Sequence, residues 1–201
     1  ALSGVGKTVG QENRLWYRRV FSLPEDWAGQ RVLLHFGAVD WQAVIWINGQ
    51  KIGRHSGGYD PFSFDITEAI KGEIKQQEIV VSVWDPTDEG TQPRGKQVKK
   101  PHGIWYTPVT GIWQTVWLEA VEKSYIKSLR ITPDIDSGEV MVTGNVAGAE
   151  SRLKVRVHVE ENGRIIAQAS GPQNQPIRLK LPDVKHWSPG NPHLYDLRVS
   201  Y

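Results

Sequence analysis

Residues 43–53 read Ala-Val-Ile-Trp-Ile-Asn-Gly-Gln-Lys-Ile-Gly, and this stretch decides the fold class. Its first half, Ala43–Asn48, is rich in the β-branched and aromatic residues that favour strands. The pair Asn48-Gly49 follows, and both residues accept the positive φ that a two-residue hairpin turn requires. The run Gln50–Gly53 then begins a second strand. The stretch therefore predicts an antiparallel β-hairpin.

Alternation of apolar and polar residues with a period of two extends to both sides of this hairpin. In Arg31–Phe36, for example, every second residue is apolar. Further strands are predicted at Glu78–Trp84, Trp113–Val121, Arg152–Glu160, Arg164–Ala169, 177–181 and 195–201. No segment keeps a helical period over three turns, and only a single short turn is expected at Asp65–Lys71. The pattern predicts an all-β protein.

A change in composition near Glu122–Ser124 predicts two domains. The chain has nine Trp residues, and only Trp187 lies beyond this point. We therefore predict two tandem β-sandwiches, a jelly roll over residues 1–122 and a smaller sandwich over residues 123–201.

Length and charge exclude several classes of function. The chain has 201 residues, 24 of them basic and 22 acidic, and no cysteine. This length can form two cores without disulfides, and the absence of cysteine leaves the compartment open. A net charge of +2 gives no reason to expect nucleic acid or a membrane as partner, and no apolar run is long enough to span a bilayer. Ala1–Gly10 lacks both Met and the pattern of a signal peptide, so we expect a processed or excised chain.

Three motifs resemble, in the same order, those of family 2 glycoside hydrolases, the β-galactosidase, β-glucuronidase and β-mannosidase group. Asn48–Thr67 reads NGQKIGRHSGGYDPFSFDIT, Thr110–Leu118 reads TGIWQTVWL, and Trp187–Tyr195 reads WSPGNPHLY. With Leu15–Arg19, the first two resemble the family's sugar-binding, galactose-binding-like jelly roll. The third resembles its immunoglobulin-like domain. Backbone chemistry agrees with these motifs. Gly57-Gly58 permits backbone conformations that other residues cannot adopt, and Pro61, which has no N–H to donate, suits the start of a strand.

The resemblance implies a non-catalytic part of a retaining β-glycosidase. In the family both catalytic carboxyl groups lie on a TIM barrel that follows these domains, and a retaining enzyme needs two carboxyls about 5–5.5 Å apart. No βα alternation occurs before Tyr201, so we assign no catalytic residue and expect the chain alone to be inactive. The expected partner is the catalytic barrel of the parent enzyme. One more strand normally follows the segment resembling Leu194–Tyr201, so we expect the second sandwich to be truncated there, with this strand at an open edge.

The segment Pro86–Pro108 is the strongest candidate for a functional loop, because long polar segments inside compact domains are uncommon. We expect Pro86–Lys100 to be poorly ordered. Four residues of the segment are candidates for contacts with carbohydrate or with the barrel: Arg94, His102, Trp105 and Tyr106.

Each candidate has a functional and a structural interpretation. Arg94 could bridge to carboxylates or sugar hydroxyls, and Trp105 and Tyr106 could stack on a sugar ring. The alternative is a polar loop whose aromatic residues pack on the jelly roll. Trp105 occupies the position at which the family's β-galactosidase branch has an acidic residue, which argues against a galactosidase-type sugar and sodium contact.

No metal or cofactor site is predicted. Asp85, Asp88 and Glu89 match no calcium-loop template, so a solvated acidic turn is the simpler interpretation. The six His residues are not spaced as zinc ligands. Four Trp residues lie in predicted strands and are expected to fill the core: Trp16, Trp46, Trp84 and Trp117.

Three functions fit the sequence. The first is an accessory region that docks on a catalytic barrel and shapes its active site. The second is an independent carbohydrate-binding module that binds oligosaccharide, since lectin-like modules share the jelly roll. The third is a structural tandem without a ligand. Oligosaccharide binding that is lost in Trp105→Ala would favour the second, and an apolar surface without bound sugar would favour the first.

Overall fold

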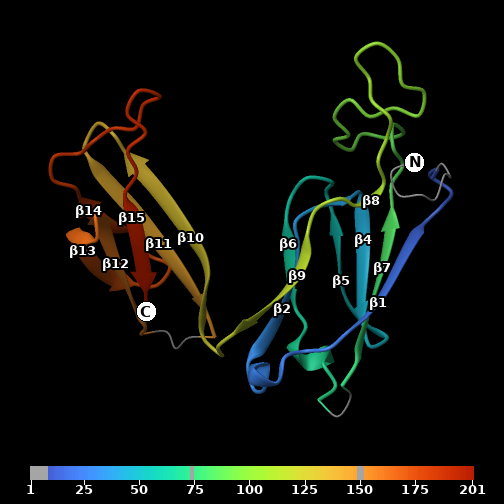
Figure 1. Ribbon diagram of the computed structural model, residues 1–201, viewed down its shortest axis with the longest axis horizontal. Coiled ribbons are helices and arrows are strands. Elements are labelled where there is room, and N and C mark those ends of the chain that lie inside the picture. Colours follow the sequence, from blue (N-terminus) through green and yellow to red (C-terminus); the bar gives the residue numbers. More distant parts are fainter. Residues whose placement is uncertain (1–8, 73–74, 149–151) are drawn as a thin grey trace. The chain divides into compact units, whose positions relative to one another are not determined.

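The computed structural model describes residues 9–72, 75–148 and 152–201, and these residues are almost entirely β-structure (Figure 1). They form fifteen strands and two three-residue 3-10 turns, η1 at Glu25–Trp27 and η2 at Thr67–Ala69. Among the described residues, therefore, no helix is long and apolar enough to cross a membrane. The chain divides between Val121 and Glu122 into two compact units, each built from its own sheets. The prediction of an all-β fold with two tandem sandwiches is confirmed.

Two antiparallel sheets form the first unit (Figure 1). One has the order β1-β7-β4-β5 and the other the order β6-β2-β9. The strands are β1 Leu15–Phe21, β2 Arg31–Phe36, β4 Gln42–Ile47, β5 Gln50–Ser56, β6 Phe62–Asp65, β7 Gln77–Trp84 and β9 Val116–Val121, and the short β3 Val39–Asp40 pairs with β8 Gly111–Ile112.

The predicted alternation supplies the core of the first unit. On β2 the inner face carries Val32, Leu34 and Phe36, all nearly or fully buried. The inner residues of β4 and β7 complete the same apolar cluster. Burying a side chain of this size stabilises a fold by about 1.5–3 kcal/mol, so these three residues contribute strongly to the stability of the unit.

The glycine and proline positions behave as predicted. Asn48 and Gly49 have φ values of 50° and 81°, and they join β4 to β5 as a two-residue hairpin. Gly57 has a φ of 143°, where the chain leaves β5 for β6 in the other sheet. A Cβ on Gly58 would lie 2.7 Å from Oδ1 of Asp40, so only glycine fits there. Pro61 precedes β6 directly, where no ladder hydrogen bond is required of it.

One predicted strand is interrupted. The sequence predicts a strand over Trp113–Val121, whereas β9 begins only at Val116. The backbone N–H groups of Trp113 and Gln114 both donate to the carbonyl of Ala38, at 3.4 Å. This shared acceptor takes residues 113–115 out of the regular ladder and turns the Trp113 side chain outward.

Two three-stranded sheets form the second unit, with the orders β10-β11-β14 and β13-β12-β15. Its strands are β10 Tyr125–Asp134, β11 Glu139–Ala147, β12 Lys154–Glu161, β13 Arg164–Pro172, β14 Ile177–Lys180 and β15 Asp196–Ser200. Val142, Val155 and Val157 are fully buried at its centre. The segment Trp187–Tyr195 contains the predicted turn, closed by a bridge between Ser188 and Asn191.

The last strand is an edge strand, as predicted. β15 pairs with β12 from Arg156↔Ser200 to Glu160↔Asp196, and no other described strand pairs with it. The Tyr201 hydroxyl donates to the carbonyl of Ser124, which fixes the final residue to the start of this unit.

Candidate functional site

A buried carboxylate joins the two ends of the long loop that follows β7. Asp85 is buried directly after the last residue of that strand. It accepts hydrogen bonds from the backbone N–H of Thr87 and from the hydroxyl of Thr110, each at 2.7 Å. Thr87 opens the loop and Thr110 closes it, so one side chain holds both ends against the sandwich.

A second buried carboxylate, that of Asp40 at the end of β3, holds the middle of the loop. The side-chain amide of Gln97 donates to Asp40 at 3.2 Å, and its carbonyl oxygen accepts from the N–H of Val109 at 2.6 Å. Burial and the nearby negative charge of Asp85 raise the pKa of Asp40 to about 6, against the lowering effect of the Gln97 hydrogen bond. Gln97 therefore connects the loop to a polar group inside the fold.

The rest of the loop is also hydrogen-bonded. Tyr106 donates its backbone N–H to Lys96 at 2.8 Å and accepts from Val98 at 3.1 Å, which forms a short parallel bridge. The backbone N–H of Lys99 donates to the carboxylate of Asp88 at 3.0 Å, and its ammonium pairs with Glu89. The argument for poor order in Pro86–Lys100 counted apolar anchors and overlooked polar side chains that satisfy the backbone, and the order of the segment stays a prediction.

The four predicted site residues all lie in this loop, but in different environments. The guanidinium of Arg94 donates to the carbonyl of Asp88 at 2.6 Å, so it braces the loop internally. Trp105 is half-buried, and its backbone N–H donates to the carbonyl of His102. His102 is exposed, and Tyr106 is 65% exposed. Tyr106 and His102 are thus the two that offer their side chains to a partner.

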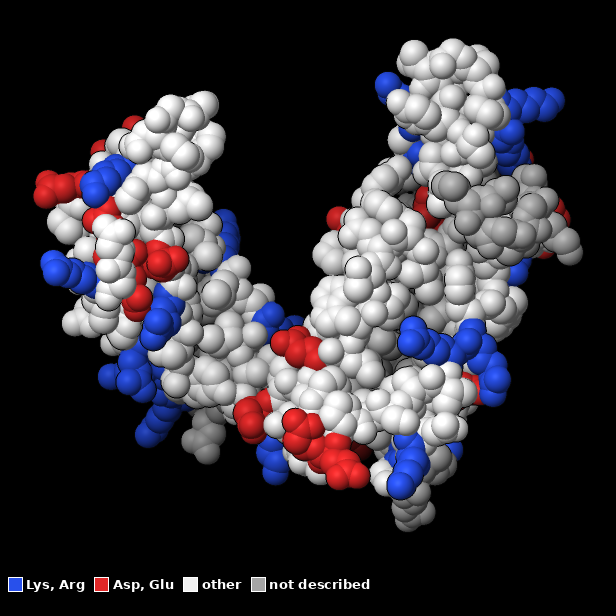
Figure 2. All heavy atoms as spheres, viewed as in Figure 1, with Lys and Arg blue, Asp and Glu red and all other residues white. Residues whose placement is uncertain are grey.

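Five exposed apolar side chains lie in this loop or in the two quoted motifs that flank it in the fold, and most of them were missed by reasoning from the sequence. These five residues, here called the loop-end surface, are Tyr59, Ile104, Tyr106, Val109 and Trp113. Trp113 is held in place because its indole N–H donates to the carbonyl of Gly58 at 2.8 Å, and its ring meets that of Tyr59 edge to face at 6.2 Å. Both residues belong to the quoted motifs, and that was the available signal. In Figure 2 uncharged atoms dominate this loop, with basic side chains at its flanks.

The acidic residues of the loop are used within the fold. Asp85 and Asp88 accept the hydrogen bonds described above. Across residues 9–72, 75–148 and 152–201, no three His, Asp or Glu side chains gather in a group that could hold a metal ion.

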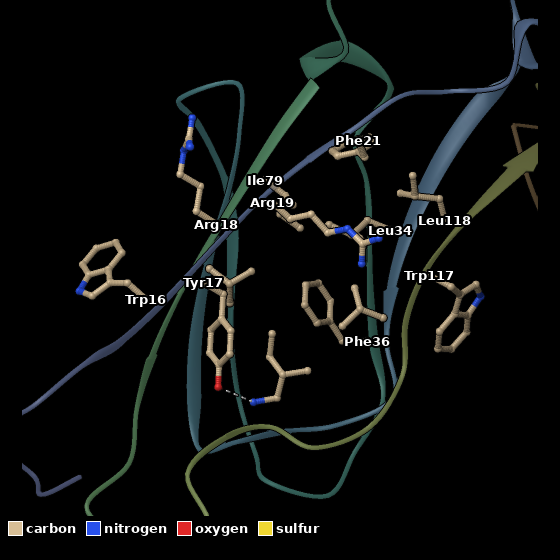
Figure 3. Close-up of a pocket in the computed structure, with 13 residues that line it drawn as sticks. Trp16, Tyr17, Arg18, Arg19, Phe21, Leu34, Phe36, Ile79, Trp117 and Leu118 are labelled. Carbon is tan, nitrogen blue, oxygen red and sulfur yellow. Dashed lines mark hydrogen bonds between the residues drawn. The ribbon is translucent and has the colours of Figure 1, made fainter. Parts of the chain in front are cut away.

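A second feature of the first unit is an open groove between its two sheets, on the side of β1 and β9 (Figure 3). The groove has a volume of about 740 Å³. Thirteen residues line it: Trp16, Tyr17, Arg18, Arg19, Phe21, Leu34, Phe36, Ile79, Val81, Ile112, Val116, Trp117 and Leu118. The hydroxyl of Tyr17 accepts a long hydrogen bond of 3.4 Å from the N–H of Ile112.

The prediction that the four Trp residues in strands fill the core is wrong. Trp16 is 63% exposed and Trp117 is 43% exposed, because both point to the outer faces of their edge strands, on the two sides of the opening (Figure 3). Trp16 stacks on Trp46 and Trp117 stacks on His35, at centroid distances of 5.7 and 4.9 Å. Trp46 and Trp84 are half-buried, and the buried core cluster contains none of these four residues. Period-two alternation identifies the two faces of a strand but does not say which one is inside.

The fold defines a class, that of tandem β-sandwich proteins, and a long loop projects from the first sandwich. Comparison with known proteins gives the family. Residues 6–128 match the profile of the glycosyl hydrolases family 2 sugar binding domain, and residues 124–201 match that of glycosyl hydrolases family 2. The chain belongs to glycosyl hydrolase family 2.

Individual proteins similar to this chain are β-galactosidases and β-glucuronidases. A β-galactosidase of Thermoanaerobacter pseudethanolicus is 31% identical over 194 residues, which cover 92% of this chain and 25% of that protein. A β-glucuronidase of Canis lupus familiaris is 29% identical over 95% of this chain and 34% of its own length. The solved apo structure of the Ruminococcus gnavus β-glucuronidase shares the fold, with a TM-score of 0.73 and 22% identity over 92% of this chain and 33% of that one. The chain thus spans about a third or less of the length of these relatives.

Proposed function

We propose that this chain is the accessory region of a retaining β-glycosidase, one that acts on a β-galactoside or a β-glucuronide. In this proposal the two sandwiches carry no catalytic residue, and the first docks on the catalytic TIM barrel of the same polypeptide. The class of substrate comes from the relatives, which are named β-galactosidases and β-glucuronidases. The described residues contain no β/α barrel, so the two carboxyls that the reaction needs must lie elsewhere in the polypeptide.

The observation that carries the proposal is the loop-end surface. Its five residues are 46–67% exposed, and large apolar side chains that remain exposed are candidates for contacts with a partner. The surface is not loose, because Asp85, Gln97 and the Tyr106 bridge fix the loop that carries it. A surface that is ordered before it meets its partner loses little entropy on docking.

We assign different roles to the four predicted residues of the loop. Tyr106 and His102 make the contacts with the barrel or with the sugar at the rim of its active site. Trp105 supports Tyr106 from its half-buried position, and Arg94 positions the loop by its bond to Asp88.

We further propose that residues 1–122 and 123–201 fold as separate domains. Val142→Ala, in the core of the second unit, should then lower the melting of that domain only.

A test uses the polypeptide encoded by the complete gene. Tyr106→Ala should lower kcat/KM for aryl β-glycosides by about 10-fold or more, as expected for a group that positions substrate or seals the active site. Lys51→Ala is the matched control, because Lys51 is an exposed residue of the hairpin turn region, away from the loop. Equal kcat/KM for Tyr106→Ala and the parent protein would contradict the proposal.

The second candidate, an independent carbohydrate-binding module, is favoured by the exposed aromatic rings of Tyr59, Tyr106 and Trp113, which can stack on sugar faces. Calorimetric titration of the 201-residue chain with oligosaccharides separates the two. Binding at millimolar affinity or better that is lost in Tyr106→Ala would support the module. Absence of binding, together with the kinetic effect of Tyr106→Ala, would support the accessory role.

A further inference from the structure

β1 divides its side chains between two faces of the first unit. Trp16 and Arg18 point to one side of the strand, whereas Tyr17 and Arg19 point to the other (Figure 3). Side chains at alternate positions of a strand lie on the same face of its sheet. Trp16 and Arg18 therefore belong to the outer face of the sheet β1-β7-β4-β5. None of the residues of this outer face belongs to the loop-end surface.

The strand register shows which side chains share the outer face. Ser82 of β7 lies directly opposite Trp16, and Val44 of β4 lies opposite Ser82. Arg54 of β5 lies opposite Val44 in turn. One row of outward-facing side chains thus crosses all four strands. Since neighbouring strands lie about 4.8 Å apart, this row extends over about 14 Å, which is longer than a single sugar ring.

Two Trp residues form an aromatic pair on the outer face. Trp46 of β4 stacks on Trp16, with 5.7 Å between the ring centroids and 28° between the ring planes. β7 lies between their two strands, so the pair spans that strand, and Ser82 on the same face is only 2% exposed. Trp16 is 63% exposed, so the side of its ring that does not meet Trp46 is open to solvent. Within the described parts of the chain, neither indole N–H has a hydrogen-bond acceptor.

Arg18 and Arg54 give the outer face its charge. The guanidinium of Arg18 donates to the carboxylate of Glu78 at 2.6 Å, yet its side chain stays 70% exposed. Arg54 is exposed, and within residues 9–72, 75–148 and 152–201 its side chain has neither an ion pair nor a hydrogen bond. Glu78 is the only acidic residue of these four strands. The outer face therefore has an excess of positive charge close to exposed indole rings.

This combination of groups fits one class of ligand. The face of an indole ring carries negative charge density, and the C–H groups on one side of a pyranose ring pack against it. A guanidinium group binds a carboxylate with two parallel hydrogen bonds. A neutral sugar uses only the ring, and an acidic peptide side chain uses only the guanidinium. A sugar that bears a carboxylate uses both.

We infer that the outer face of the sheet β1-β7-β4-β5 binds an acidic oligosaccharide. A uronic acid unit stacks on the open side of Trp16, and carboxylates of the same chain of sugars pair with Arg54 and Arg18. The length of the row fits several linked units rather than one. The inference rests on this face alone and requires neither a catalytic barrel nor the loop-end surface. Binding at this face persists in Tyr106→Ala, so its failure is distinguishable from failure of the proposed function.

Calorimetric titration of the 201-residue chain with a tetramer of β-1,4-linked glucuronic acid tests the inference. Cellotetraose is the matched neutral control, because it has a CH2OH group in place of each carboxylate and is otherwise the same. We expect the acidic tetramer to bind at millimolar affinity or better, and cellotetraose to bind at least about 10-fold more weakly, since it offers the guanidinium groups no charged acceptor. Absence of binding, or equal affinity for the two tetramers, would overturn the inference.

Substitutions locate the bound sugar. Trp16→Ala and Arg54→Ala should each weaken binding of the acidic tetramer by about 10-fold or more, and Arg54→Ala removes an exposed side chain without a partner, so that variant should fold normally. Trp117→Ala is the control and should leave the affinity unchanged, because Trp117 is also exposed and stacked but lies in the other sheet. Binding that is lost in Tyr106→Ala and kept in Trp16→Ala would overturn the inference.

Sedimentation of the 201-residue chain checks for a different occupant of the outer face. We expect a monomer at the concentrations used for titration. Dimerisation that Trp16→Ala abolishes would overturn the inference, because the outer face would then be covered by a second copy of this chain.

Discussion

Two regions of the first unit differ in how completely their polar groups are hydrogen-bonded. The loop over residues 85–110 is polar and irregular, yet its backbone and side chains are joined by hydrogen bonds to each other and to two buried carboxylates. The groove between β1 and β9 is apolar and flanked by regular strands, yet two sheet edges are unpaired among the described strands, and Tyr17 and Val116 on its lining are partly exposed. The comparison shows that regular secondary structure does not by itself mean that all polar backbone groups are paired. The irregular loop is therefore the more completely hydrogen-bonded of the two regions, and the groove is the more open one.

The largest expected loss of stability is at the floor of the groove, and substitution at its rim should cost much less. Phe36 is fully buried, so Phe36→Ala should lower the free energy of unfolding by about 3–5 kcal/mol. Trp117→Ala removes a larger but 43% exposed side chain and should cost about 1 kcal/mol or less. Chemical denaturation of the 201-residue chain measures both. A loss of stability for Trp117→Ala as large as that for Phe36→Ala would show that the Trp side chains belong to the core after all.

The next effect concerns the anchor of the loop. Gln97→Ala removes the hydrogen bonds to Asp40 and to the N–H of Val109, and should destabilise the first unit by about 1–3 kcal/mol. Amides of residues 96–109 should exchange faster in the same variant. Gln50→Ala, at an exposed position of the hairpin, is the control and should change neither quantity. Unchanged exchange along the loop in Gln97→Ala would mean that the loop is held by other contacts.

A smaller effect depends on pH. The pKa of Asp40 is raised from 3.8 to about 6, so the folded state keeps a proton that the unfolded state releases in this window. The stability contributed by Asp40 is therefore present in full below pH 3.8 and is lost as the pH rises to about 6. Asp40→Asn, which resembles the protonated carboxyl, should be more stable than the parent chain by roughly 1–2 kcal/mol at pH 7–8.

The same comparison at pH 4 supplies the control, because the two proteins should then differ much less. Thermal melts at both pH values give the result. A difference between Asp40→Asn and the parent chain that does not depend on pH would show that the pKa of Asp40 is not raised in the folded state.

The smallest effect on stability is expected at the loop-end surface. Tyr106 is 65% exposed and its hydrogen bonds come from the backbone, so Tyr106→Ala should change the free energy of unfolding by no more than about 0.5 kcal/mol. Thermal melting of the short chain measures it. A large loss would identify Tyr106 as a structural residue and remove the basis for its proposed role in docking.

The sequence predicted the sheets well where local chemistry decides them. The Asn48-Gly49 hairpin, the Gly57-Gly58 passage and the alternating strand β2 are local features, and all were found as predicted. β10 was missed because it is an edge strand, with most residues exposed and Pro133 near its end, so it lacks a clear apolar face. β11 was missed although it alternates, because Gly144 interrupts its inner row, where a Cβ would lie 3.1 Å from Val155.

The site was predicted only in part, for a physical reason. Composition pointed to the loop, but the bonds that order it join Gln97 to Asp40, residues 57 positions apart. The exposure of Trp16 and Trp117 likewise depends on which face of each edge strand is the outer one, which no pattern within either strand can show. Resemblance to the family identified the class of protein, and the structure was needed to distinguish the braced Arg94 from the exposed Tyr106.

The most direct test of the central claim is the hydrolysis of aryl β-galactosides and β-glucuronides. We predict no turnover by the 201-residue chain, turnover by the polypeptide encoded by the complete gene, and a loss of about 10-fold or more in kcat/KM when Tyr106→Ala is introduced into the latter. Turnover by the purified 201-residue chain that disappears when one of its Asp or Glu residues is replaced would contradict the account, because the chain would then carry a catalytic carboxylate of its own.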